Sequence, residues 1–177
     1  MDLLSLTVLC GPLVDPAMTL RVIAVESAGH PYVIHDNTTR RSVDAGSADK
    51  AAETAKELIA AGHRIDVGLM QINANAWLRD TGMPIEKAFD PCTNIRLGTA
   101  ILSADYARAL SSSGTPQVVL KAALSLYNSG SESKSLSYAE VVLREPHHGH
   151  HPNPPRRTRA ELALRASVEF PNDSSPR

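Results

Sequence analysis

The chain has 177 residues, a hydrophobic content of 42%, an aromatic content of 4% and a formal net charge of −1. This length is sufficient for one domain with its own core, and the near-neutral charge argues against a nucleic-acid-binding protein, which is usually strongly basic. No apolar run approaches the roughly 20 residues of a membrane span. Residues 1–10 are apolar but lack a basic region and a small-residue cleavage site, so we expect an N-terminal helix of the mature domain and not a signal peptide.

A short helix that ends at a carboxylate is predicted next in the chain. Asp15 and Pro16 form a typical helix start, because the aspartate caps the first N–H groups and proline fits the first helical position. Gly29 can take the left-handed conformation that ends a helix. Glu26 then lies in the last turn, where the helix dipole and apolar neighbours both favour the neutral acid. A protonated carboxyl group suits general acid catalysis, although a solvated glutamate near a helix end has the same sequence pattern.

Four further helices are predicted from apolar residues that recur with helical spacing. Two of them begin at a capping residue followed by proline, at Asp90-Pro91 and at Thr115-Pro116. A short strand near residues 32–34 is the only strand that the pattern indicates. The sequence therefore predicts a mainly α domain of several short helices, and the four further helices are expected at residues 47–61, 91–110, 116–127 and 136–144.

The composition of the chain changes near residue 146. Residues 147–157 are rich in proline and histidine, and four of the seven histidines lie there. No cysteine or carboxylate accompanies them at metal-ligand spacing, so we interpret this segment as a polar linker and expect no metal site. The predicted organisation is a domain over residues 1–145, followed by a Pro/His-rich linker and flexible C-terminal tail over residues 146–177, with a short helical candidate at 160–168.

Two further motifs carry groups that suit a groove for a polar polymer such as a sugar chain. In the first, Gly68 permits close approach of the backbone, Met70 offers an adaptable apolar wall, and Gln71 offers both a donor and an acceptor. In the second, Tyr127 and Asn128 place a phenol and an amide at the end of a predicted helix. Each motif alone is also compatible with a turn that enters the core or with a buried capping pair.

In this order along the chain, the motifs resemble those of the lysozyme-like lytic transglycosylases, and they are closer still to the VirB1-type enzymes of type IV secretion systems. The resemblance covers about residues 6–144 and implies a lysozyme-like fold of several short helices. Each motif is weak alone, but the ordered set is specific. The segments that carry the resemblance are residues 24–27, 34–38, 60–63, 66–73 and 89–95.

The resemblance also implies roles for individual residues. Glu26 would be the only catalytic acid and base, and Ser27 would help to orient it. Tyr127 would hydrogen-bond near Glu26. One departure from the family is Leu126, which stands where alanine usually precedes the Tyr-Asn pair. The residues implied to bind substrate or shape its groove are Ser27, Gly68, Met70, Gln71, Tyr127 and Asn128.

The reaction implied by the resemblance is cleavage of the β-1,4 bond between N-acetylmuramic acid and N-acetylglucosamine in peptidoglycan. Glu26 would protonate the glycosidic oxygen and then take a proton from the C6 hydroxyl of the sugar, which attacks C1 and gives a 1,6-anhydro product. The acetamido group of the substrate can stabilise the reacting centre, so a second carboxylate is not obligatory. We expect no cofactor, and we expect structural roles for Asp36 and Asp66, the nearest carboxylates in the motifs.

Cellular context and alternatives follow from the same resemblance. The implied partners are peptidoglycan strands and components of a type IV secretion or conjugation apparatus. The enzyme would act in the periplasm and open the cell wall locally for this apparatus. We expect no nucleic-acid partner and no membrane span. Cys10 and Cys92 are either a disulfide or two free thiols by count alone, but a location outside the cytoplasm favours a disulfide. The alternatives are a hydrolytic muramidase and a non-catalytic peptidoglycan-binding scaffold of the secretion apparatus.

Overall fold

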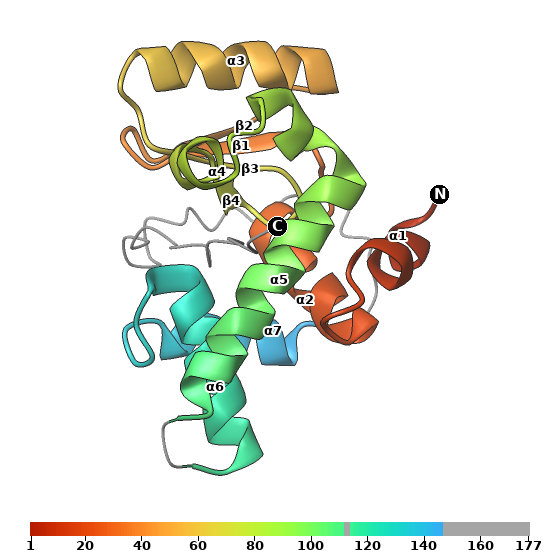
Figure 1. Cartoon of the computed structure of the whole chain (residues 1–177), viewed down its shortest axis with the longest axis vertical. Helices are drawn as coiled ribbons and strands as arrows, with labels where there is room; N and C mark the ends of the chain where they lie inside the picture. The colour runs from red at the N-terminus through yellow and green to blue at the C-terminus, as the bar shows by residue number, and fades with distance from the viewer. Residues whose placement is uncertain (112–113, 147–177) are drawn as a thin grey trace, which may run out of the picture.

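The computed structural model describes residues 1–111 and 114–146, and the predicted tail and its helical candidate lie outside these residues. The described part is mainly α, as the sequence predicts, with a small sheet inserted after the second helix (Figure 1). The helices are α1 (Leu3–Cys10), α2 (Pro16–Ser27), α3 (Ala48–Ala60), α4 (Ala74–Thr81), the 3-10 helix η1 (Ile85–Phe89), α5 (Pro91–Ala109), α6 (Pro116–Ser129) and α7 (Leu136–Arg144). The strands are β1 (Val33–Asp36), β2 (Arg41–Asp44), β3 (Ile65–Val67) and β4 (Ile72–Asn73).

The helix starts that combine a capping residue with proline are confirmed, although the Thr115 side chain makes no capping hydrogen bond at the start of α6. Asp15 accepts hydrogen bonds from the first N–H groups of α2, and Asp90 accepts one from Thr93 at the start of α5. The helix predicted at residues 116–127 continues for two more residues, because the left-handed Gly130 ends α6. Sequence analysis missed α4 and η1, which are too short to show a clear helical period.

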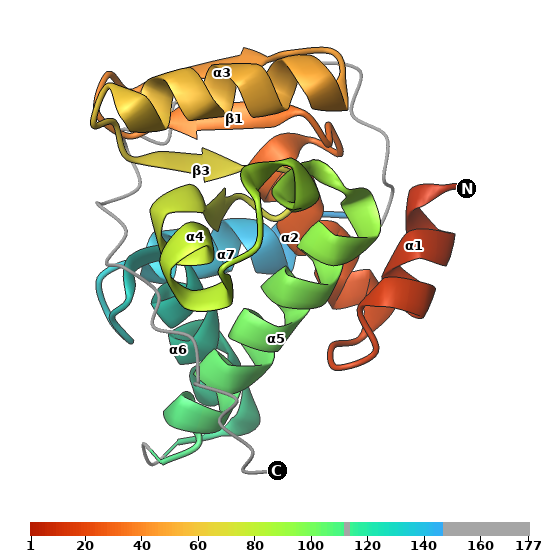
Figure 2. The ribbon, with the colours of Figure 1, turned by 45° about the horizontal axis from the view of Figure 1, so that its top comes forward.

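The four strands form one antiparallel sheet in the order β2-β1-β3-β4, and the sequence indicated only part of β1. Ile34 pairs with Val67 and Asp36 pairs with Ile65, so β1 and β3 lie in the middle of the sheet. All four residues of β2 are exposed and three of them are polar, and β4 has two residues, so neither shows the alternating pattern by which strands are recognised. α3 packs against β1 and β3 (Figure 2).

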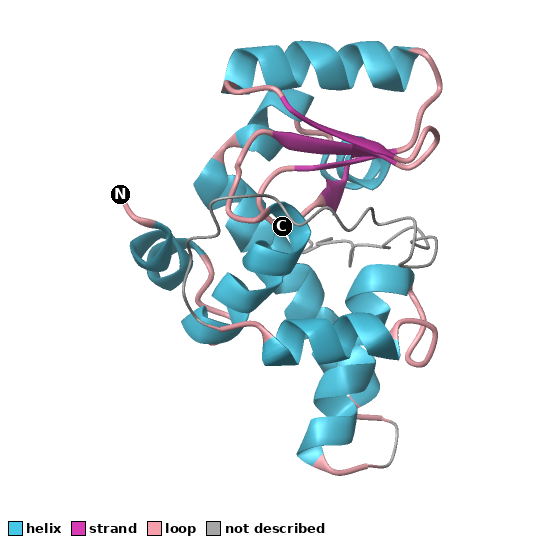
Figure 3. Ribbon diagram, turned by 180° about the vertical axis from the view of Figure 1, so that it is seen from behind, coloured by secondary structure: helices cyan, strands magenta, loops and turns pink. Residues whose placement is uncertain are grey.

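Helix α5 connects the two halves of the domain. It is about 28 Å long at 1.5 Å per residue, and it contacts η1 near its start, α1 along its side and α6 near its end. The sheet, α3 and α4 lie toward one end of α5, and α6 lies toward the other (Figures 1 and 3). In the described parts of the chain, no helix is both long enough and apolar enough to cross a lipid bilayer.

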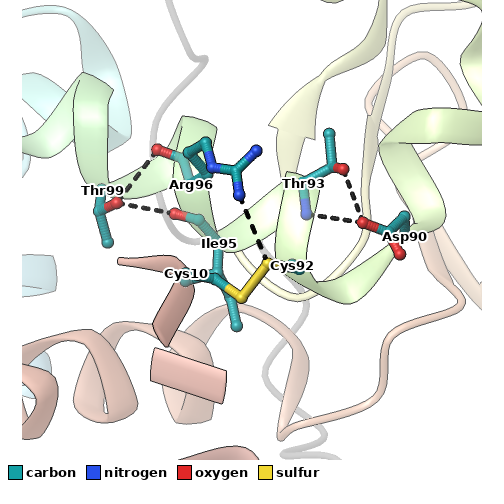
Figure 4. The surroundings of a disulfide bond; sticks show 7 residues. All are labelled: Cys10, Asp90, Cys92, Thr93, Ile95, Arg96 and Thr99. Atoms are coloured by element: carbon teal, nitrogen blue, oxygen red, sulfur yellow. Dashed lines mark hydrogen bonds between the residues drawn. A yellow bond between two sulfur atoms is a disulfide. The ribbon is translucent and has the colours of Figure 1, made fainter. Parts of the chain in front are cut away.

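The predicted disulfide between Cys10 and Cys92 is confirmed. It joins the last residue of α1 to the first turn of α5, with a Cα–Cα distance of 5.2 Å (Figure 4). The two helices also pack closely next to the bond, since a Cβ on Gly11 would lie 2.9 Å from the Thr99 methyl group. The bond therefore fixes α1, which has several exposed apolar residues, against the central helix.

Replacement of both cysteines by serine is expected to lower the free energy of unfolding by about 4 kcal/mol, because the bond closes a loop of 82 residues and so restricts the unfolded chain. Urea denaturation of the double variant and the wild type measures this loss. Thiol titration of the denatured wild type without reductant should find no free thiol among the two cysteines. Two reactive thiols per chain would contradict the disulfide.

Candidate active site

Glu26 lies in the last turn of α2 and is half-buried, as the sequence predicts. The helix is capped by Ala28, whose φ of 53° is left-handed, and the predicted cap residue Gly29 follows with a φ of 80°. The hydroxyl of Tyr138 in α7 donates a hydrogen bond of 2.7 Å to Oε1 of Glu26. Because the tyrosine is 1% exposed, packing holds its hydroxyl group in place against the carboxyl group.

Ser27 attaches the end of α2 to the Gly-Leu-Met-Gln turn at residues 68–71. Its hydroxyl donates a hydrogen bond of 2.8 Å to the carbonyl of Leu69, and a longer contact of 3.2 Å joins it to the carbonyl of Ile23 in its own helix. The side chain is 5% exposed. Ser27 therefore fixes the position of the neighbouring Glu26 relative to the turn, which is consistent with its predicted orienting role.

The turn at residues 68–71 has an unusual backbone. Gly68 has a φ of 78° and Gln71 a φ of 50°, and the left-handed region is costly for a residue with a side chain. The Gln71 amide supports this conformation, because its Nε2 donates to the carbonyls of Val33 and Gly68 at 3.1 and 2.9 Å. The turn is thereby hydrogen-bonded to the first strand of the sheet, and the backbone strain lies beside the candidate acid.

The amide of Asn94 in α5 holds the same turn from the opposite side. Its Oδ1 accepts from the N–H of Met70 at 2.8 Å, and its Nδ2 donates to the carbonyls of Val67 and Ala88. The residue is 0% exposed. A Cβ on Gly68 would lie 2.8 Å from Cγ of Asn94, so this close packing requires glycine at that position.

Tyr127 also contacts the turn, since its hydroxyl donates a hydrogen bond of 2.7 Å to the carbonyl of Met70. The side chain of Met70 is fully buried against Gly98 of α5, where a Cβ would lie 2.7 Å from that of Met70. The structure thus brings these predicted site residues together, but it buries the Met70 side chain in the core. A direct contact of Met70 with a glycan stays a prediction.

Asn128 belongs to a buried polar group between α6 and α7. Its Nδ2 donates to Ser135 Oγ at 3.0 Å, and its Oδ1 is buried without a hydrogen-bond partner among the described residues. Ser125 Oγ donates to the carbonyl of Ser131 and accepts from the N–H of Ser135. These bonds fix the loop that leads into α7, and so they place Tyr138 opposite Glu26.

Sequence reasoning missed Tyr138 and did not assign a role to Asn94. Tyr138 lies in the helix predicted at residues 136–144, but its neighbours carry no recognisable motif and it is 112 residues from Glu26. Asn94 lies within a segment that carries the family resemblance, beside Cys92. A polar residue at a helix position that faces the core could have indicated its role, because buried polar groups need hydrogen-bond partners.

Asp36 has the structural role that we expected. It accepts hydrogen bonds from the N–H groups of Thr38 and Thr39 and from the Thr39 hydroxyl, and it pairs with His63 Nδ1 at 2.8 Å. Burial raises the pKa of Asp36, but the hydrogen bonds from Thr39, His63 and the backbone outweigh it and lower the pKa to about 2. Such a carboxylate is too weak a base to accept a proton near neutral pH.

Asp66 is likewise held by neighbouring side chains. It is 0% exposed, and its carboxylate oxygens accept from the amides of Asn37 and Asn73 at 2.9 and 3.2 Å. These bonds connect the β1–β2 turn, β3 and β4. The expected structural role of Asp66 is therefore supported.

A mostly apolar hollow of about 550 Å³ lies at the other end of α2, where Val14 and Met18 line it together with Leu120. Met18 and Glu26 are about 12 Å apart along the helix axis at 1.5 Å per residue. We therefore do not assign this hollow to the site around Glu26.

The arrangement around Glu26 can deliver one proton and take it back. The carboxyl group stands at the end of an apolar helix, receives a hydrogen bond from a buried phenol, and adjoins a turn held on three sides by Ser27, Tyr127 and Asn94. Rigid positioning of this kind is what acid–base catalysis needs. Among the residues that the structure describes, no group of three or more histidine, cysteine or acidic side chains is placed to hold a metal ion.

The residues of this site lie within a region of the chain that matches a known protein family. A model of the transglycosylase SLT domain matches residues 9–140. This range contains α2, the turn at residues 68–71, α6 and Tyr138. The match therefore covers every described residue that forms the site around Glu26.

Three similar proteins have related names. The chain is 32% identical over 121 residues to protein VirB1 of Agrobacterium fabrum, covering 68% of this chain and 49% of that protein. It is 36% identical over 122 residues to the type IV secretion system protein VirB1 of Brucella suis, covering 68% and 51%. It is 30% identical over 164 residues to protein VirB1 of Rhizobium radiobacter, covering 93% and 63%. The chain thus spans about half the length of the first two relatives, and no solved structure matches it at a significant level.

Replacement of Asp36 by Asn is expected to lower the free energy of unfolding by about 2 kcal/mol at neutral pH, because each unit by which the pKa of Asp36 is lowered stabilises the folded state by roughly 1.4 kcal/mol. This stabilisation is fully present above the unfolded-state pKa of about 4. It is lost as the pH falls through the folded-state pKa of about 2. Urea denaturation across this range measures it.

The matched control is Glu53→Gln, which alters an exposed carboxylate in the middle of α3. Its stability should differ little from that of the wild type at any pH. A stability difference between Asp36→Asn and the wild type that stays constant from neutral pH down to pH 2 would contradict the assignment.

Proposed function

The chain belongs to the transglycosylase SLT domain family, and on that premise we propose that it is a peptidoglycan lytic transglycosylase. It cleaves the β-1,4 bond between N-acetylmuramic acid and N-acetylglucosamine and leaves a 1,6-anhydro end. The observation that carries the proposal is the hydrogen bond between Tyr138 and Glu26, which holds a lone carboxyl group at a helix end beside the turn at residues 68–71.

Glu26 acts first as an acid and then as a base. Its carboxyl group gives a proton to the glycosidic oxygen as the bond to C1 breaks, and the leaving sugar departs with a new hydroxyl group. The resulting carboxylate then takes the proton of the C6 hydroxyl, whose oxygen bonds to C1 of the same sugar. The proton returns to Glu26, so each turnover leaves the enzyme unchanged and consumes no water.

A single carboxylate is sufficient for this path, because the nucleophile is part of the substrate. A hydrolase of the usual kind needs a second carboxylate to activate water or to form a covalent intermediate. The two carboxylates nearest in the motifs, Asp36 and Asp66, are engaged in hydrogen bonds that fix the sheet. This arrangement favours the transglycosylase over a muramidase.

Five further residues complete the proposed site. Gly68 and Gln71 give the glycan a rigid backbone wall, and Tyr127 holds that wall through the Met70 carbonyl. Asn128 fixes the start of α7. In this arrangement Ser27 and Tyr138 orient Glu26, while the turn presents the substrate to it.

The cellular role that we propose is local opening of the cell wall during assembly of a secretion or conjugation apparatus. Its support is the name of the Brucella suis relative, a type IV secretion system protein. The proposed location is the periplasm, where the proposed substrate lies, and components of the apparatus are the proposed partners. The proposal also assigns the cleavage activity to the domain over residues 1–145, with residues 146–177 as a linker and tail that take no part in the chemistry.

Replacement of Glu26 by Gln keeps the shape of the side chain and removes its transferable proton. The variant is expected to fold normally and to release anhydro-muropeptides at least about 10²-fold more slowly, which is the lower limit for general acid–base catalysis. Mass spectrometry of digested peptidoglycan measures the products. An anhydro product is lighter by one water than a hydrolysis product, so the same spectra separate the transglycosylase from a muramidase.

The variants Asp36→Asn and Asp66→Asn serve as controls, and each should still form anhydro products under conditions where it stays folded. Near wild-type release of anhydro-muropeptides by Glu26→Gln would overturn the assignment. Products that carry the extra water would show that the protein is a muramidase and not a transglycosylase. A lack of any product from the wild type would favour the non-catalytic scaffold.

Replacement of Tyr138 by Phe removes the hydrogen bond to Glu26 but keeps the packing of the ring. We expect kcat to fall about fivefold, since one hydrogen bond contributes roughly 1 kcal/mol, while KM stays unchanged. The control is Tyr106→Phe, at the hollow on the far end of α2, which should keep full activity. An unchanged kcat for Tyr138→Phe would show that the contact does not orient the acid.

A further inference from the structure

Three arginines gather at the end of the sheet that lies away from the turn at residues 68–71. Arg40 is in the β1–β2 turn, Arg41 is the first residue of β2, and Arg64 comes directly before β3. We call this group the arginine edge. None of the three was among the residues that the sequence motifs singled out.

The backbone holds these positions side by side. Arg41 pairs with Asp36 of β1, and Asp36 pairs on its other side with Ile65, the residue after Arg64. The N–H of Arg64 donates to Thr38 Oγ1 at 3.1 Å, and its carbonyl accepts from Asn37 at 2.8 Å. Two strand spacings of about 4.8 Å each separate β2 from β3, so Arg41, in β2, and Arg64, next to β3, flank Asp36 at the same end of the sheet.

The charges of the arginine edge are uncompensated among the described residues. Arg40, Arg41 and Arg64 are all exposed, and none of them forms an ion pair there, whereas Lys56, Lys121, Arg79 and Arg108 do. Two carboxylates on the same strands are engaged in other contacts. Those of Asp36 and Asp66 are buried and already bound to the hydroxyl, imidazole, amide and backbone donors of their own network.

The backbone at Arg40 is left-handed, at the last residue of the β1–β2 turn. Its φ of 60° is left-handed, a conformation that glycine adopts freely and a residue with a Cβ does not. In the described part of the chain, the other residues with a side chain and a positive φ are Ala28 and Gln71, and both are at the candidate site. Strain of this kind collects at functional positions.

The sheet connects the arginine edge to the proposed catalytic site. The N–H of Gly68 donates to the carbonyl of Val33, at the catalytic end of β1. From Val33 to Asp36 the strand advances about 10 Å at 3.3 Å per residue. The arginine edge therefore lies about 10 Å from the turn at residues 68–71 along the strand direction, within reach of a peptide carried by a glycan held at that turn.

We propose that the arginine edge binds free carboxylates of the peptides that peptidoglycan strands carry. This inference rests on the proposed function and adds a specificity to it: the enzyme distinguishes peptide-bearing strands from bare glycan. Guanidinium groups suit this ligand, because their planar donors match a carboxylate in bidentate geometry. An exposed site gains less from each pair than a buried one, so three arginines acting together are needed.

The test compares strands that carry their peptides with the same strands after an amidase has removed them. Binding is measured by calorimetry at low salt in the Glu26→Gln background, so that the strands stay intact. The protein with all three arginines intact is expected to bind peptide-bearing strands about tenfold more tightly than strands without peptides. A variant with Arg40, Arg41 and Arg64 replaced by Gln should bind both equally, and added salt should reduce the preference.

A charge-matched control carries Gln at Lys50, Lys87 and Arg96, which are exposed elsewhere on the domain; it should keep the preference. Arg40→Gly serves as a second variant, since it relieves the left-handed strain. It should melt at the same temperature as the wild type or higher and yet lose part of the preference. That combination separates a role in binding from a role in folding.

Equal binding of both substrates by the unsubstituted protein would overturn the proposal, and so would a preference that survives loss of the three arginines. Binding of the arginine edge to anionic phospholipid vesicles, with no preference for peptides, would overturn it in favour of a membrane. Failure of the proposed function looks different. In that case wild-type protein would release no anhydro product from either substrate, whatever the binding data show.

Discussion

The site depends most on one buried amide. Asn94 of α5 satisfies one N–H group and two carbonyls of three separate segments: the turn at residues 68–71, the end of β3, and η1. None of these groups can reach water, and an unsatisfied buried polar group costs roughly 1–3 kcal/mol. The amide therefore fixes the turn to the central helix, and Ser27 transmits that position to Glu26. The start of α5 at Asp90 and Pro91, and the disulfide one residue later, place Asn94 where the turn needs it.

Local chemistry explains which parts of this fold the sequence could predict. Helices that begin with a capping residue and proline, such as α2 and α5, were predicted to within a residue or two, because the signal lies in the helix itself. The sheet was largely missed. Its strands are two to four residues long and one is wholly exposed. They show no hydrophobic alternation in the sequence, and they are stabilised by pairing with other strands of the sheet.

The same limit applies to the candidate site. Glu26, Ser27 and the turn at residues 68–71 stand in motifs, and the structure brings them together as expected. Tyr138 does not, because its role depends on how α7 packs against α2. Met70 shows what a residue type alone leaves open: it suggested an apolar wall, and the fold places the side chain beside Gly98 and the carbonyl group against the Tyr127 hydroxyl. Residue types indicate chemistry, whereas the direction of a side chain is a property of the packed fold.

The separation of Glu26 and Tyr138 along the chain has a consequence for biosynthesis. The carboxyl group is made early, but its phenolic partner lies in the last described helix, 112 residues later. A chain that is still on the ribosome, or that stops short of α7, carries the acid without the group that orients it. The buried Ser125 of α6 and Ser135 before α7 add to this dependence, since their hydrogen bonds hold α7 in place only after the loop has closed. The carboxyl group of Glu26 therefore gains its orienting hydrogen bond only after the chain has been made through α7.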